Sequence, residues 1–167
     1  MRTYYLVIVV LVFLLMQLVA ADRMSLGPAA PDFLILVTAF FGLYRGAIAG
    51  SIFGFVIGLL QDVFNPGYLG LNALTKTVLG FTMGKAGAKT FPENAAFLFV
   101  LLASVSWGHD ILYLVFFNWP NIGVTFRSIF IAALPSALYT ALLGLVVHKI
   151  LTLLGNKVVG AVGKEGR

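Results

Sequence analysis

The chain contains no cysteine, and charged residues make up only 10% of its 167 positions. Without cysteine it can form neither a disulfide nor a thiolate nucleophile or metal ligand. The shortage of charge is more informative, because an ordinary soluble domain carries about 25% charged residues. Hydrophobic residues account for 60% of the sequence, and the mean hydropathy is +1.02. These values exclude a water-soluble domain and predict an all-α protein embedded in a membrane.

The net charge of +5 does not indicate binding to nucleic acid. Lys and Arg stand singly between apolar stretches rather than in a basic patch, as expected for residues that set membrane topology. We therefore expect membrane lipids as partners, and no nucleic acid.

Four apolar stretches are long enough to cross a bilayer, which takes about 20 residues. They comprise residues 4–21, 69–85, 94–118 and 126–154. The first stretch also resembles a secretory signal peptide, in which Ala20 and Ala21 would mark the cleavage site. Its apolar part is long for a signal sequence, which favours a helix retained in the protein.

A fifth apolar run, residues 32–60, is interrupted by Tyr44, Arg45 and Gly46. One long helix would place Arg45 near the bilayer centre, at a cost of about 2.5–3.5 kcal/mol. Two helices, at residues 32–43 and 46–60, would place Arg45 in a tight turn at the membrane surface. The first of these is short, so we expect it to tilt, to thin the bilayer or to re-enter.

The distribution of basic residues favours two helices over residues 32–60, and therefore six helices in the whole chain. With the N-terminus inside, eight Lys and Arg residues fall on the cytoplasmic side and two on the outer side. The inner set is Arg2, Arg45, Lys85, Lys89, Lys149, Lys157, Lys164 and Arg167, and the outer set is Arg23 and Arg127. Five helices would turn the basic C-terminal part outward, against the positive-inside rule. We predict a six-helix transmembrane domain over residues 1–154, with both termini in the cytoplasm, and a basic flexible tail over residues 155–167.

Glycines recur every four residues along the third expected helix, at Gly46, Gly50, Gly54 and Gly58. This spacing places them on one stripe, where small residues let helix backbones approach closely. The stripe fits packing inside the bundle or, alternatively, docking of a partner's transmembrane helix.

Polar residues expected inside the membrane are Asp62, Asn72, Lys76, His109 and Asp110. A rise of about 1.5 Å per residue puts Lys76 and Asp110 about 10 and 12 Å below the outer ends of their helices. We predict that these two form an ion pair, with Asn72 and His109 as hydrogen-bonding neighbours. A structural pair is favoured, and a transport or proton-relay role is the alternative.

Adjacent helical residues point about 100° apart, so we do not expect His109 and Asp110 to bond each other. No nucleophile motif and no zinc motif accompanies them. We therefore predict no catalytic residue, no metal site, no cofactor and no enzymatic activity.

Residues 58–74, GLLQDVFNPGYLGLNAL, resemble the central signature of the rod shape-determining protein MreD family. In that family a G-L-L-x-D helix end is followed by a short loop and L-G-x-x-A-L. The segments Pro31-Asp32-Phe33-Leu34 and Tyr44-Arg45-Gly46, the chain length and the basic tail are similar too.

This resemblance implies a non-enzymatic scaffold of the cell-elongation machinery in the bacterial cytoplasmic (inner) membrane. It implies binding to MreC and, indirectly, action on a SEDS glycosyltransferase, a class B penicillin-binding protein and MreB. It also implies a fold similar to the substrate-binding subunits of ECF vitamin transporters. A subunit of a small-molecule transporter is the alternative function, although residues 4–13 lack the Ala-x-x-x-Ala stripe that those subunits use on their first helix.

Overall fold

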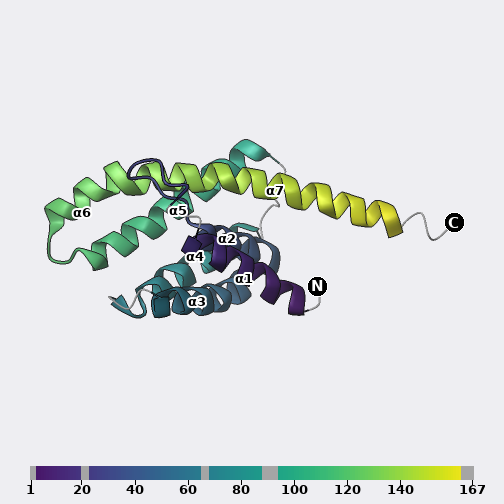
Figure 1. The fold of residues 1–167 in the computed structure, drawn as a ribbon, viewed down its shortest axis with the longest axis horizontal. Helices are drawn as coiled ribbons and strands as arrows, with labels where there is room; N and C mark the ends of the chain where they lie inside the picture. The colour runs from purple at the N-terminus through teal and green to yellow at the C-terminus, as the bar shows by residue number, and fades with distance from the viewer. Residues whose placement is uncertain (1–2, 20–22, 65–67, 88–93, 163–167) are drawn as a thin grey trace.

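The computed structural model describes residues 3–19, 23–64, 68–87 and 94–162, most of which are helical (Figure 1). The elements are α1 (Thr3–Val19), α2 (Phe33–Arg45), α3 (Ala47–Phe64), α4 (Leu71–Gly87), α5 (Ala95–Phe117), α6 (Ile122–Ser128), a π-helical turn η2 (Ile129–Ala133) and α7 (Leu134–Val162). Because α6, η2 and α7 continue one another without a break, the described residues form six helical elements. The predicted all-α class is confirmed.

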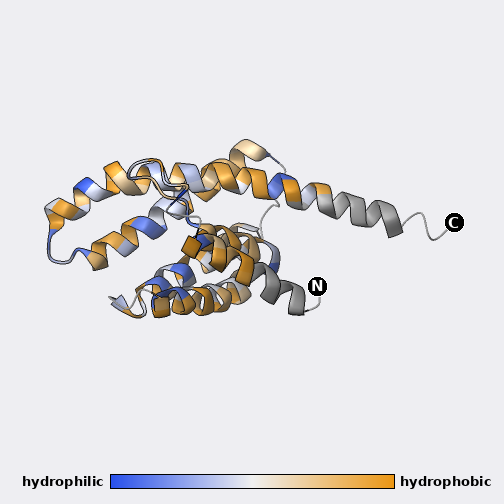
Figure 2. Ribbon diagram, viewed as in Figure 1, coloured by the Kyte–Doolittle hydropathy of each residue, from blue (hydrophilic) through white to orange (hydrophobic). Residues whose placement is uncertain are grey.

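Three elements are long and apolar enough to cross a bilayer: Ala47–Phe64, Ala95–Phe117 and Ile122–Ile150. Much of their ribbon has the hydrophobic colour, and the strongly hydrophilic colour is confined to a few positions (Figure 2). The helix α2 is apolar but has only 13 residues. That length reaches about 20 Å, against a hydrocarbon core of about 30 Å. The helix α2 is therefore too short to cross the bilayer by itself.

The apolar run at residues 32–60 folds as two helices, as predicted, but they extend over residues 33–45 and 47–64 and meet at Gly46. Gly46 has a φ of +89°, a conformation that residues with a side chain rarely adopt. Its amide still donates to the carbonyl oxygen of Gly42 at 2.8 Å, so α2 closes with a regular bond before the chain turns. Gly46 is thus the hinge between α2 and α3.

The glycine stripe of α3 lies directly against the backbone of α4. A Cβ atom added to Gly50, Gly54 or Gly58 would collide with a backbone carbonyl oxygen. The three oxygens belong, in that order, to Gly80, Lys76 and Asn72, so the two helices run antiparallel. This face of α3 is used within the chain, which leaves no room there for the partner helix considered above. An added Cβ at Gly46 meets nothing within 4 Å, but the backbone of Gly46 lies against Gly84 of α4, where an added Cβ would collide with it.

A hydrophobic core joins α2, α4, α5 and α7. Its buried members are Ile35, Ala39, Phe40, Leu43, Leu79, Met83, Leu98, Leu102 and Ala141. The helices α5 and α7 run side by side, and the region of α6 extends beyond the group formed by α1 to α4 (Figure 1).

The last helical element is longer than predicted at both ends. It begins at Ile122 rather than at residue 126, and it continues to Val162 instead of ending at residue 154. Most of the expected flexible tail is therefore helical, and residues 163–167 lie outside the described part. The turn η2 immediately precedes Leu134 and Pro135. Pro135 has no amide hydrogen to complete an α-helical bond to Ile131, which explains an irregular turn here.

Candidate functional site

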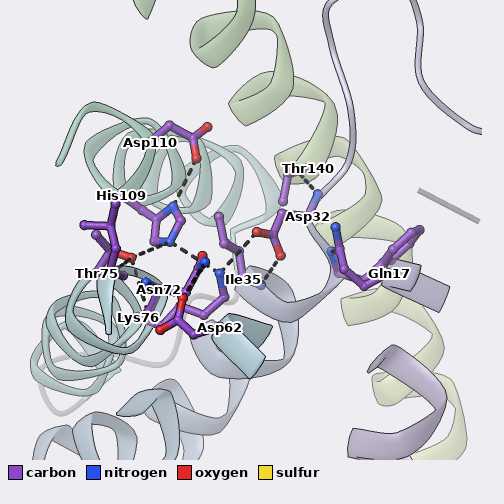
Figure 3. A network of polar contacts seen from close by, with 12 residues as sticks. Gln17, Asp32, Ile35, Asp62, Asn72, Thr75, Lys76, His109, Asp110 and Thr140 are labelled. Carbon is purple, nitrogen blue, oxygen red and sulfur yellow. Dashed lines mark hydrogen bonds and ion pairs between the residues drawn. The ribbon is translucent and has the colours of Figure 1, made fainter. Parts of the chain in front are cut away.

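Asp62, near the C-terminal end of α3, caps the N-terminus of α4 (Figure 3). Its buried carboxylate accepts hydrogen bonds from the backbone amides of Gly70, Asn72 and Ala73 at 3.0–3.1 Å. It also accepts one from Asn72 Nδ2 at 2.9 Å. The first amides of a helix lack hydrogen-bond partners within the helix and carry its positive partial charge. A carboxylate accepts their hydrogen bonds and offsets that charge. Asp62 and Asn72 therefore join α3 to α4.

Lys76 lies in α4 with no exposed surface, and its Nζ donates to Asp32 Oδ2 at 3.2 Å. Asp32 is the N-cap of α2, where its Oδ1 accepts the amide of Ile35 at 2.8 Å. One carboxylate thus caps α2 and neutralises the buried lysine of α4.

His109, from α5, lies between this ion pair and Asp110 (Figure 3). Its Nε2 is 3.4 Å from Lys76 Nζ and 3.0 Å from Thr75 Oγ1, and its Nδ1 is 3.0 Å from Asp110 Oδ1. The tautomer sets the direction of each contact: with the ring hydrogen on Nδ1, the imidazole donates to Asp110 and accepts at Nε2. His109 links Thr75 and Lys76 of α4 to Asp110 of α5.

These contacts correct three predictions. Lys76 pairs with Asp32 rather than with Asp110, because His109 stands between Lys76 and Asp110. Asn72 belongs to the Asp62 cap and not to the surroundings of Lys76. His109 and Asp110 do bond each other, because rotation about their side-chain torsions brings together groups whose Cα–Cβ directions diverge.

Asp32 was missed as a site residue, although the sequence contains a signal for it. An aspartate that follows proline and opens an apolar run is typical of a helix N-cap. The sequence does not indicate how deep in the helix bundle this N-cap lies. The chain enters the bundle before α2 begins, so the N-terminus of this short helix lies beside Lys76 in the middle of α4.

Side chains from α1 and α7 hold the segment that leads into α2. The amides of Ala30 and Asp32 donate to Ser136 Oγ and Thr140 Oγ1, both at 3.1 Å, and the amide of Phe33 donates to Gln17 Oε1 at 2.7 Å. Irregular backbone inside a membrane protein needs partners from the protein, since water is scarce there. These three polar side chains supply them.

A cavity of about 260 Å³ lies beside this network, between α1, α5, η2 and α7. Both carboxylates of the network line it: the side chains of Asp32 and Asp110 keep 21% and 24% of their surface exposed, whereas Lys76 is fully buried. The remaining lining residues are Gln17, Ala30, Pro31, Tyr113, Leu114, Ala132, Ala133, Ser136 and Thr140. The acidic side of the network therefore faces the cavity. Among the described residues no group of three His, Asp or Glu side chains is placed to hold a metal ion.

The family model described as rod shape-determining protein MreD matches residues 1–158 of the chain. The chain belongs to the MreD family. Membership implies a role in the determination of rod shape, and the family consists of structural membrane proteins that are not known enzymes. Searches of curated proteins and of solved structures gave no match.

The described part of the MreD signature, residues 58–64 and 68–74, lies where α3 meets α4. Gly58 lies against the backbone of Asn72, and Asp62 accepts hydrogen bonds from the first amides of α4. The most recognisable residues of this MreD-family chain thus form the junction of two helices.

Proposed function

We propose that the chain is a non-enzymatic scaffold of the cell-elongation machinery that binds MreC and through it regulates peptidoglycan synthesis. The observation that carries this proposal is the MreD family match over residues 1–158. A scaffold role also suits the use of the buried charges. Asp32, Asp62 and Lys76 all join one helix to another.

Two experiments in cells test this role. MreC should copurify with the tagged chain from mild detergent, and depletion of the chain should convert rods into rounded cells. A variant with Gly108→Ala should behave as the wild type, because a Cβ at Gly108 meets nothing within 4 Å. Rod shape maintained without the chain, or MreC never retained by a chain that restores rod shape, would contradict the proposal.

We further propose six membrane crossings by residues 1–154, in the bacterial cytoplasmic membrane, with both termini inside. The eight-to-two distribution of Lys and Arg supports this topology, and so does the hinge at Gly46, which places Arg45 at a helix end. The crossing that contains α2 combines this short helix with the irregular segment before it.

The absence of native cysteine makes the topology directly testable. In intact spheroplasts a membrane-impermeant maleimide should label Leu26→Cys, which is exposed in the loop before α2. It should label Arg45→Cys and Lys85→Cys only after the membrane is permeabilised. Labelling of Arg45→Cys from outside would invert the α2–α3 hairpin and refute the six-crossing topology.

The alternative function, a substrate-binding subunit of a small-molecule transporter, is favoured by one observation, the cavity of about 260 Å³ beside Asp32 and Asp110. Native mass spectrometry of the purified protein separates the two functions. A scaffold is expected to carry MreC, whereas a retained small molecule in a chain whose loss leaves cell shape unchanged would favour the transporter.

A further inference from the structure

The buried network contains two carboxylates and one lysine. Asp32 is paired with Lys76, whereas Asp110 contacts the imidazole of His109. Among the described residues no Lys or Arg lies within ion-pair distance of Asp110. Asp110 is therefore the carboxylate of the network that has no lysine or arginine partner, in a region where charge is expensive.

The two oxygens of the Asp110 carboxylate have different surroundings. Asp110 Oδ1 is already bonded to His109, whereas Oδ2 has no hydrogen-bond partner within the described part of the chain. Figure 3 shows this second oxygen directed away from His109. Asp110, which lines the cavity, therefore has one oxygen free to accept a hydrogen bond from a ligand.

The cavity combines this carboxylate with further acceptors and with an apolar wall. Tyr113, Ser136 and Thr140 present hydroxyl groups, and Leu114, Ala132 and Ala133 present hydrocarbon. Its volume of about 260 Å³ far exceeds the roughly 10–15 Å³ that a cavity needs to hold one water molecule. The space suits an organic group of several atoms rather than a bare ion.

We propose that this cavity binds an organic cation, with a primary ammonium or guanidinium group at the carboxylates of Asp110 and Asp32 and a short hydrocarbon part against Leu114, Ala132 and Ala133. Such a group donates several hydrogen bonds and gives Asp110 a cationic partner. This proposal is independent of the proposed binding of MreC, so the two are tested separately.

Binding of n-butylammonium to the purified protein at pH 7.5, measured by titration calorimetry and saturation-transfer NMR, tests the proposal. Neutral n-butanol, of the same length, is the matched ligand control. We expect saturable binding of the cation and at least about tenfold weaker binding of the alcohol, because only the cation forms charge-assisted hydrogen bonds.

Variants of two kinds locate the binding. Asp110→Asn preserves shape and should weaken cation binding at least about tenfold, whereas Asp110→Glu should retain it. Ala132→Leu fills the cavity without a change in charge and should weaken both ligands. Circular dichroism and gel filtration establish that each variant is folded. Equal affinity for alcohol and cation, an unaltered affinity in both Asp110→Asn and Ala132→Leu, or no saturable binding of the cation at all would overturn the proposal.

The ammonium group could belong to a free molecule or to a lipid headgroup, and nanodiscs distinguish the two sources. In discs of phosphatidylglycerol alone, n-butylammonium should bind as it does in detergent. In discs rich in phosphatidylethanolamine, whose headgroup carries a primary ammonium, binding should be lost if the lipid fills the cavity and kept if the natural ligand is a free cation. Loss of binding in both kinds of disc would show that the detergent result does not apply to the membrane and would overturn the proposal.

Discussion

Replacement of Lys76 with methionine isolates the contribution of the buried ion pair to the stability of the bundle. The substitution leaves Asp32 without its ammonium partner, and loss of one member of a buried pair costs about 3–5 kcal/mol. Asp32 keeps 21% of its side-chain surface and faces the cavity, so solvent moderates the loss. For Lys76→Met we expect the lower value, about 3 kcal/mol.

The reverse substitution, Asp32→Asn, is expected to cost more. It leaves a fully buried ammonium without an anion, which places it at the upper value of about 5 kcal/mol. Asparagine accepts the amide hydrogen of Ile35 as well as aspartate does, so the cap of α2 is preserved and the loss reports the charge alone. In the double variant neither member of the pair is left charged without the other, and stability should return to within about 2 kcal/mol of the wild type, since buried ion pairs replaced as a unit are often neutral.

The free energies of unfolding can be measured in mixed micelles of dodecyl maltoside and sodium dodecyl sulfate, with helix content followed by circular dichroism. Lys85→Met is the matched control: Lys85 lies on the same helix but is exposed, with its ammonium 4.8 Å from the centre of the Phe81 ring. Its loss should cost about 0.5–1 kcal/mol. The reasoning is refuted if Lys76→Met costs no more than Lys85→Met, or if the double variant loses the sum of the single losses.

Two further substitutions probe the α3–α4 junction in the same unfolding assay. Gly54→Ala should destabilise the protein by about 1–3 kcal/mol, because the added Cβ collides with the carbonyl oxygen of Lys76. The control Gly108→Ala, in open space, should be neutral or should stabilise the protein by up to about 1 kcal/mol. Equal effects of the two substitutions would show that α3 and α4 are not in backbone contact. Asp62→Asn turns an amide group toward buried backbone donors and should cost about 2–4 kcal/mol, from roughly 1–3 kcal/mol for each donor left unpaired. Removal of the exposed N-cap of α5 by Asn94→Ala should cost only about 1 kcal/mol, and an equal or larger loss there would contradict the role of Asp62.

The sequence predicts the helices well because their determinants are local. Hydropathy marks the apolar runs, and the cost of burying Arg45 divides residues 33–64 where Gly46 does form a hinge. The four-residue spacing of the glycines identifies one face of α3, but it does not show which helix packs against that face. The helix is α4, and this depends on long-range packing.

The partner of Lys76 was out of reach for a related reason. Depth counted along continuous helices selects Asp110, which does lie in the same network. Asp32 comes to that depth only because an irregular segment carries the chain into the bundle before α2 begins. A depth estimated from the rise per helical residue does not apply to such a segment. Its path is fixed by hydrogen bonds to Ser136 and Thr140, which are more than 100 residues away in sequence.

The position of the MreD signature changes how substitutions in it must be interpreted. Gly58, Asp62 and Asn72 contact one another's helices rather than a free surface, so a variant at any of them perturbs the α3–α4 junction first. Loss of rod shape or of MreC in such a variant is therefore expected from misfolding alone. A partner contact must be sought among exposed residues, and a phenotype can be assigned to it only where the free energy of unfolding is unchanged.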